Sequence, residues 1–277
     1  MPFIETRDRT AIFYKDWGKG NPVVFSHGWC LGADIWEYQM TPLAGRGLRC
    51  IAHDRRGCGR SSQPWTGYDF DTLADDLAAL MDRLDLREVT LVGHSMGTAE
   101  IARYLTRHGT GRVARVALVA TTLPFLVATD DNPGGIDRGV FEQLVADLRR
   151  DRPRAMAAGA PGFFGVGLPG VAISDEMIRW GIGLALQASP VATIDLQLAG
   201  AGTDFRPDLA SFTVPTLLVH GDGDLGSPLE LTARRTARAI PGSQLVVYEG
   251  HGHGLFLTAA DRLNRDLLAF VRGQSAS

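Results

Sequence analysis

The chain has 277 residues and a mass of 29.9 kDa, enough for one large domain or two small ones. It is 45% hydrophobic and 21% charged, a balance that supports a sizeable core and excludes an intrinsically disordered protein. The 28 Lys and Arg residues and 31 Asp and Glu residues give a net charge of −3, so no basic excess points to nucleic acid or an anionic membrane as a partner.

Short apolar segments rich in β-branched residues recur along the chain and predict strands. The predicted strands are, in chain order, Ile12–Tyr14, Val23–Phe25, Arg49–Ala52, Val89–Val92, Val113–Val119, Thr216–Val219 and Gln244–Tyr248. Helical spacing of apolar residues predicts helices between them. These are a helix with Leu73, Leu77, Leu80 and Leu84, capped by Asp71 or Thr72, a helix over Ala99–His108, and a last helix with Leu263, Leu267 and Phe270. The alternation predicts an α/β fold with a doubly wound, mostly parallel sheet.

The stretch from Thr121 to Arg206 interrupts this alternation. It contains several prolines and two helical patterns, Phe141–Arg150 and Asp175–Leu186, but no convincing strand. We therefore predict a single domain over residues 1–277, with residues 121–206 forming a helical cap insertion at one end of the sheet.

One motif indicates a serine nucleophile. The predicted strand Val89–Val92 runs into Gly93-His94-Ser95-Met96-Gly97, and a helix follows. A serine at such a strand-to-helix turn sits on strained backbone, and the two flanking glycines leave the room that it needs. The helix N-terminus also supplies N–H groups that stabilise an oxyanion. The alternative is a serine that only caps the helix.

A serine nucleophile needs a base and a group that orients the base. Asp222 and Asp224 follow one late strand, and His251 and His253 follow the next. Because reactive groups gather at the carboxyl ends of parallel strands, all of them are expected near Ser95. The same acids and histidines also suit a zinc or manganese site, an alternative that leaves the serine turn unexplained.

Seven stretches together resemble the α/β-hydrolases, and more narrowly the bacterial arylesterases that are also called cofactor-free (non-haem) haloperoxidases or perhydrolases. They are Phe25–Trp29, Trp36–Met40, His53–Ser61, Gly93–Gly97, Thr203–Asp208, His220–Asp224 and His253–Gly254. The resemblance covers nearly the whole chain and implies an eight-stranded α/β-hydrolase fold.

The resemblance also selects among the paired residues. The family acid lies four residues before a proline, which favours Asp224 over Asp222, and the family histidine precedes glycine and an apolar segment, which favours His253 over His251. Asp222 is then a turn former and His251 a loop histidine without a chemical role. The implied catalytic residues are Ser95, Asp224 and His253, the backbone amides of Trp29 and Met96 form the oxyanion hole, and no cofactor or metal is implied.

The resemblance implies cleavage of small aryl or alkyl carboxylic esters through an acyl-enzyme. Hydrogen peroxide in place of water gives a peracid, which halogenates substrates indirectly. The alternatives are a γ-lactam amidase on the same residues and a ligand receptor without turnover. The expected partners are a small ester or lactam and hydrogen peroxide, with self-association left open. Candidate pocket residues from the insertion are Phe125, Phe141, Phe163, Phe164 and Trp180.

Three residues depart from, or stand out within, the family pattern. Cys30 stands where relatives carry an apolar residue or proline, and Thr98 stands where many carry glycine. Cys58 lies among arginines that could depress its pKa, although a structural turn is the simpler interpretation.

The cysteines and the chain ends set the expected compartment. The three cysteines show no Cys-x-x-Cys spacing, so neither a disulfide framework nor a thiolate zinc site is expected. The N-terminal residues lack the pattern of a secretory signal, and no stretch reaches the roughly 18 apolar residues of a membrane span. We expect a soluble, cytoplasmic protein without a membrane partner.

Overall fold

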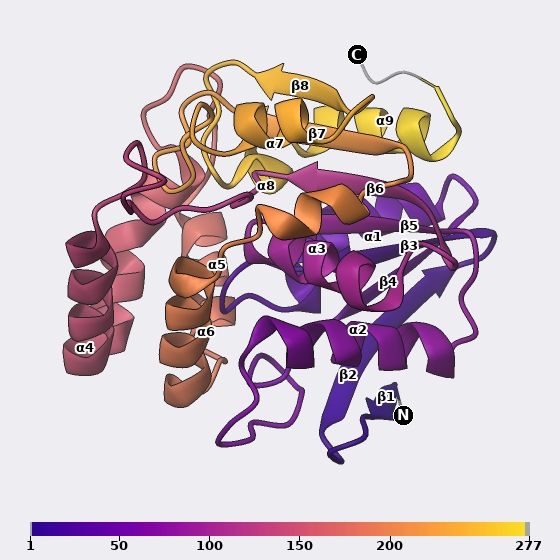
Figure 1. The fold of residues 1–277 in the computed structure, drawn as a ribbon, viewed down its shortest axis with the longest axis horizontal. Coiled ribbons are helices and arrows are strands. Elements are labelled where there is room, and N and C mark those ends of the chain that lie inside the picture. The colour runs from indigo at the N-terminus through magenta and orange to yellow at the C-terminus, as the bar shows by residue number, and fades with distance from the viewer. Residues whose placement is uncertain (1, 275–277) are drawn as a thin grey trace.

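The computed structural model describes residues 2–274. Within this range eight strands form one sheet in the order β1-β2-β4-β3-β5-β6-β7-β8 (Figure 1). The strands are β1 (Phe3–Glu5), β2 (Ala11–Gly18), β3 (Asn21–Ser26), β4 (Leu48–His53), β5 (Val89–His94), β6 (Val113–Val119), β7 (Thr216–Gly221) and β8 (Gln244–Tyr248). The pairs β1–β2 and β2–β4 are antiparallel, and all other neighbours are parallel. This confirms the predicted α/β fold with an eight-stranded, mostly parallel sheet.

Helices cover both faces of the sheet. Helices α2 (Phe70–Arg83) and α3 (Met96–His108) pack together on one face, while α1 (Glu37–Ala44) and α9 (Ala260–Val271) pack together on the other. Every residue of β5 and β7 is therefore buried, which is why these strands are mostly apolar and do not alternate between apolar and exposed polar residues. The shorter elements are α7 (Ala233–Ala239), α8 (Leu255–Thr258) and the 3-10 turns η1 (Ala33–Trp36) and η2 (Pro207–Ser211).

Three helices lie between β6 and β7 in the sequence and gather at one end of the sheet, at the left of Figure 1. They are α4 (Arg138–Phe164), α5 (Asp175–Ala185) and α6 (Pro190–Gly202). We call these three helices the cap. The limits of the insertion, residues 121–206, and the single-domain division stay predictions.

Prolines shape the cap without breaking it. Helix α4 bends at Asp151, whose φ of −156° and ψ of 84° are not helical. The bend relieves the effect of Pro153, which has no N–H for the Arg149 carbonyl oxygen and whose ring would clash with it in an unbroken helix. The Asp151 carboxylate accepts the Arg154 N–H at 3.1 Å and so restarts the helix. Helix α6, which the sequence did not predict, has Pro190 at its first position, where a missing N–H does no harm.

Some boundaries differ from the predictions. The N-cap of α2 is Asp69, whose side chain accepts the Thr72 N–H at 2.9 Å, so the predicted caps Asp71 and Thr72 are wrong. Strand β1 is only three residues long and helix α1 has weak amphipathicity, and the sequence predicted neither. Among residues 2–274 no single helix is long and apolar enough to cross a membrane, and only the pair α5 and α6, bent by 95°, passes on joint length and composition.

Candidate active site

Ser95 occupies the sharp turn between β5 and α3. Its φ of 52° and ψ of −120° are unusual for a residue with a side chain and store strain at this position. The Ser95 N–H donates to the Val119 carbonyl oxygen at 3.0 Å, which ties the turn to β6. A Cβ atom on Gly97 would lie 2.3 Å from the Ser26 carbonyl oxygen, and one on Gly93 would lie 2.7 Å from the Gly97 carbonyl oxygen. The turn thus needs these glycines for their lack of bulk.

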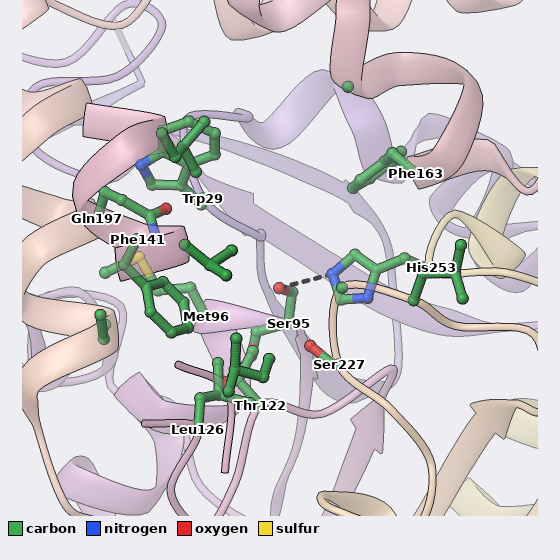
Figure 2. Close-up of a pocket in the computed structure, with 18 of the residues that line it drawn as sticks. Trp29, Ser95, Met96, Thr122, Leu126, Phe141, Phe163, Gln197, Ser227 and His253 are labelled. Carbon is green, nitrogen blue, oxygen red and sulfur yellow. Dashed lines mark hydrogen bonds between the residues drawn. The ribbon is translucent and has the colours of Figure 1, made fainter. Parts of the chain in front are cut away.

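Ser95, His253 and Asp224 form a hydrogen-bonded chain. His253 Nε2 lies 2.8 Å from Ser95 Oγ (Figure 2), and His253 Nδ1 lies 2.6 Å from Asp224 Oδ2. Burial raises the pKa of Asp224, but His253 and the Ser227 N–H outweigh it, so the pKa lies below its usual value. An ionised Asp224 accepts the Nδ1–H of His253, which leaves Nε2 free to accept the hydroxyl proton of Ser95.

Asp222 and His251, the alternatives to Asp224 and His253, do not contact Ser95. Asp222 accepts the Gly250 N–H at 2.7 Å and joins the turns after β7 and β8. His251 Nδ1 lies 3.3 Å from Thr258 Oγ1. The structure therefore brings Asp224 and His253 to Ser95, and leaves Asp222 and His251 in the surrounding loops. Among residues 2–274 no group of three or more His, Cys, Asp or Glu side chains could hold a metal ion.

The loop after β3 faces the start of α3. Met96 is the first residue of α3, a position whose N–H has no partner within the helix. His27 holds the loop: its Nδ1 donates to the Gly28 carbonyl oxygen at 2.7 Å, and its Nε2 accepts the Arg55 N–H at 2.9 Å. Burial and the Arg55 charge keep the pKa of His27 well below its usual value, so the neutral ring can both donate and accept. The assignment of the Trp29 and Met96 amides to an oxyanion hole stays a proposal.

The buried ion pair of Arg55 and Glu100 contacts the loop after β3. Arg55 Nε donates to Glu100 at 2.6 Å, and the same guanidinium donates to the His27 carbonyl oxygen at 2.8 Å. Burial raises the pKa of Glu100, but Arg55 and His53 outweigh it and lower the pKa to about 2. No local sequence pattern indicates this ion pair, because Arg55 and Glu100 lie 45 residues apart.

A second set of contacts that sequence reasoning missed steadies the serine turn. The Leu123 N–H donates to Thr121 Oγ1 at 3.1 Å, Thr121 Oγ1 lies 2.9 Å from Thr98 Oγ1, and Thr98 Oγ1 donates to the Ser95 carbonyl oxygen at 2.6 Å. A carbonyl oxygen cannot donate, so each hydroxyl in this series donates toward Ser95. Thr98 thus anchors the strained turn by a hydrogen bond that a glycine could not make.

His94 connects the same turn to the loop that carries His253. Its Nε2 lies 3.0 Å from the His253 carbonyl oxygen. Burial lowers the pKa of His94 well below its usual value, so a neutral ring donates this bond. The contact fixes the backbone of His253 relative to Ser95.

The cavity above Ser95 has a volume of about 560 Å³ and a mostly apolar wall. Of the predicted aromatic residues, Phe141 and Phe163 line it (Figure 2). Phe164 lies behind Phe163 with ring centroids 4.9 Å apart, Phe125 belongs to a separate small core, and Trp180 contacts Tyr38 with centroids 6.0 Å apart. The lining also includes residues that the sequence did not indicate, among them Gln197, Leu196, Leu225 and Ser227.

The cysteines near the site are buried thiols. Burial raises the pKa of Cys58 to about 12 and raises that of Cys30 well above its usual value. The alternative of a depressed pKa for Cys58 is therefore wrong, and the structural interpretation of that turn holds. Cys30 has a left-handed φ of 57° in the loop after β3.

Known proteins resemble the chain over almost its entire length. The family described as "alpha/beta hydrolase fold" matches residues 21–260. A non-heme chloroperoxidase of Kitasatospora aureofaciens is 45% identical, covering 98% of this chain and 99% of the relative, and a bifunctional esterase/perhydrolase of Acinetobacter calcoaceticus is 37% identical, covering 98% and 100%.

Solved structures of other proteins also resemble the chain over almost its entire length. The crystal structure of a bromoperoxidase from Bacillus anthracis superposes with a TM-score of 0.92 at 40% identity, covering 95% of this chain and 96% of that one. An esterase from Exiguobacterium antarcticum superposes with a TM-score of 0.93 at 34% identity, covering 98% of both chains.

Proposed function

The chain belongs to the α/β-hydrolase fold family, and we propose that it is a serine hydrolase of small carboxylic esters that also uses hydrogen peroxide as an acyl acceptor. The observation that carries the proposal is the 2.8 Å contact between Ser95 Oγ and His253 Nε2 at the base of an apolar cavity. This arrangement gives a nucleophile, its base and room for an apolar substrate at one place.

The reaction runs through an acyl-enzyme. Ser95 Oγ attacks the ester carbonyl carbon while His253 Nε2 takes the hydroxyl proton, and Asp224 stabilises the imidazolium that forms. The backbone amides of Trp29 and Met96 hold the oxyanion, each contributing about 10²–10³ in rate. The tetrahedral intermediate collapses, and the leaving alcohol takes its proton from His253. Water then attacks the acyl-enzyme with the help of His253 and releases the carboxylic acid.

The perhydrolase activity uses the same intermediate. Relatives named esterase/perhydrolase and non-heme chloroperoxidase support this second acceptor. Hydrogen peroxide attacks the acyl-enzyme in place of water, so that the product is a percarboxylic acid and Ser95 is regenerated. The percarboxylic acid then oxidises a halide ion to hypohalous acid and returns to the carboxylic acid.

The test combines active-site labelling with turnover. Wild-type protein should react with a fluorophosphonate probe and hydrolyse an aryl acetate. Ser95→Ala should lose labelling and lower kcat by about 10⁴–10⁶. Ser211→Ala, a control outside the cavity in η2, should keep both activities. Near-wild-type hydrolysis by Ser95→Ala would refute the mechanism, and ligand binding without turnover by the wild type would indicate a receptor.

The acceptor and substrate class are tested on the same preparation. Peroxide with acetate should support halide oxidation that disappears in Ser95→Ala, while a bicyclic lactam tests the amidase alternative. Faster lactam opening than aryl ester hydrolysis would overturn the ester assignment. Loss of activity with a strong chelator would favour a metal-dependent reaction.

A further inference from the structure

A second cavity lies beside the first, between α4, α5 and the loop after β3. Its volume is about 210 Å³. It is lined by uncharged residues, among them Met156 and Ala160 of α4. Four other lining residues, Trp29, Leu144, Gly159 and Phe163, also line the cavity above Ser95. The two spaces therefore share a wall.

The second cavity is suited to a hydrocarbon group. None of its lining side chains is charged, and the single polar group among them, the Trp29 indole N–H, donates to the Thr193 carbonyl oxygen at 2.9 Å. An apolar cavity of about 150 Å³ is already large enough to bind benzene. The space beside the active site exceeds that size and offers a ligand only apolar contacts.

The shared wall is thin at one position. Gly159 has no side chain, and a Cβ atom built on it would meet nothing within 4 Å. In Figure 2 both Trp29 and Phe163 lie above Ser95 and His253, Trp29 to the left and Phe163 to the right. The hydrogen bond from the Trp29 indole to the Thr193 carbonyl oxygen holds this side chain in place, so this part of the shared wall keeps its shape without a substrate.

We propose that the second cavity is a subsite for an alkyl chain or ring of the substrate that extends past the reacting carbonyl. The inference rests on the proposed ester hydrolysis and names the substrate class: esters with an apolar extension of several carbons, in preference to acetates of small alcohols. Each methylene group that moves from water into such a site raises kcat/KM about fourfold.

Two series of substrates identify the half of the ester that enters. One series lengthens the acyl chain of p-nitrophenyl esters from acetate to octanoate, and the other lengthens the alcohol of acetate esters. For the wild type, kcat/KM should rise with length in one of the two series and level off once the cavity is full.

Two variants change the cavity in opposite directions. Ala160→Leu fills it from α4, since Ala160 is buried and lines only this cavity. Its kcat/KM for the preferred long ester should fall about 15- to 60-fold, the effect of two to three excluded methylenes, and its kcat/KM for the shortest ester should stay within about twofold. Met156→Ala enlarges the same space and should move the levelling-off to longer chains.

The matched control is Ala157→Leu. Ala157 lies on the same helix, is exposed and lines neither cavity, so its length profile should follow the wild type. Unchanged profiles in both Ala160→Leu and Met156→Ala would overturn the subsite, and so would an equal loss on short and long esters in a folded Ala160→Leu variant. The proposed function fails differently: the wild type would then hydrolyse no ester of any length and would not react with the fluorophosphonate.

Discussion

Replacement of Asp224 by asparagine tests how the structure sets the tautomer of His253. Asp224 Oδ1 accepts two backbone N–H groups, from Gly226 at 3.0 Å and from Ser227 at 2.8 Å. Its Oδ2 accepts Nδ1–H of His253 at 2.6 Å. An asparagine keeps the two backbone bonds only if its oxygen takes the Oδ1 position, which turns its NH₂ group toward His253.

The opposite orientation is unfavourable. It would turn NH₂ toward the N–H groups of Gly226 and Ser227. The Ser227 N–H is buried and would lose its acceptor, so the orientation is disfavoured by about 1–3 kcal/mol. The asparagine NH₂ therefore donates to Nδ1, which moves the imidazole proton to Nε2. That proton then faces Ser95 Oγ, and the ring cannot act as the base. We expect kcat to fall by about 10⁴, the loss known for this substitution in a serine protease.

The assay is hydrolysis of p-nitrophenyl acetate, with thermal unfolding to show that the variant is folded. The matched control is Asp222→Asn, because Asp222 accepts only the Gly250 N–H, which an amide oxygen accepts equally well. Its kcat should stay within about threefold of wild type. A folded Asp224→Asn variant with kcat within tenfold of wild type would refute the reasoning. An equal loss in Asp222→Asn would show that the turn, and not the contact with His253, matters.

Three further predictions concern stability and reactivity. The pKa of Glu100 is lower in the folded chain (about 2) than its ordinary value of 4.5. The ionised carboxylate therefore stabilises the folded state fully above pH 4.5, and about 3 kcal/mol of the free energy of unfolding is lost as the pH falls toward 2. In urea unfolding, the free energy of unfolding of Glu100→Gln should not show this dependence on pH. The three cysteines, all buried, should resist a thiol reagent until the protein is unfolded, and fast native labelling would contradict the assigned burial. Thr98→Val keeps the side-chain volume but removes the hydroxyl that donates to the Ser95 carbonyl oxygen. Its free energy of unfolding should be about 1–3 kcal/mol lower than that of Thr98→Ser. Equal stability of the two variants would argue against Thr98 as an anchor of the serine turn.

What the sequence revealed depends on how far apart the interacting residues lie. The serine turn was predictable because strand, glycines and helix are adjacent in the chain. Seven of the eight strands were predictable because a buried parallel sheet requires apolar segments. Resemblance, and not spacing, separated Asp224 from Asp222 and His253 from His251. The supporting contacts had no local pattern: Thr98 meets Thr121 across 23 residues, and this bond exists only once β5 and β6 are paired.

The cap was the least predictable part. Its prolines suggested interruptions, but Pro190 starts α6 and Pro153 follows a bend within α4. A proline in the first turn and a proline in the middle of a helix look alike in a sequence, because the difference lies in which backbone N–H groups need partners. The cavity beside the active site depends on how α4 and α5 pack, which periodicity alone does not determine.

The contact between Ser95 and His253 also makes hydrolysis a reporter of complete folding. The two residues are 158 positions apart, and β6, β7 and β8 must pair in parallel before the loop after β8 reaches the serine turn. Contacts between residues so far apart in the sequence form slowly, because the chain loses the entropy of closing a long loop before strand pairing stabilises it. During refolding, helical circular dichroism should return before ester hydrolysis does. Catalytic activity therefore measures the last step in the assembly of the sheet.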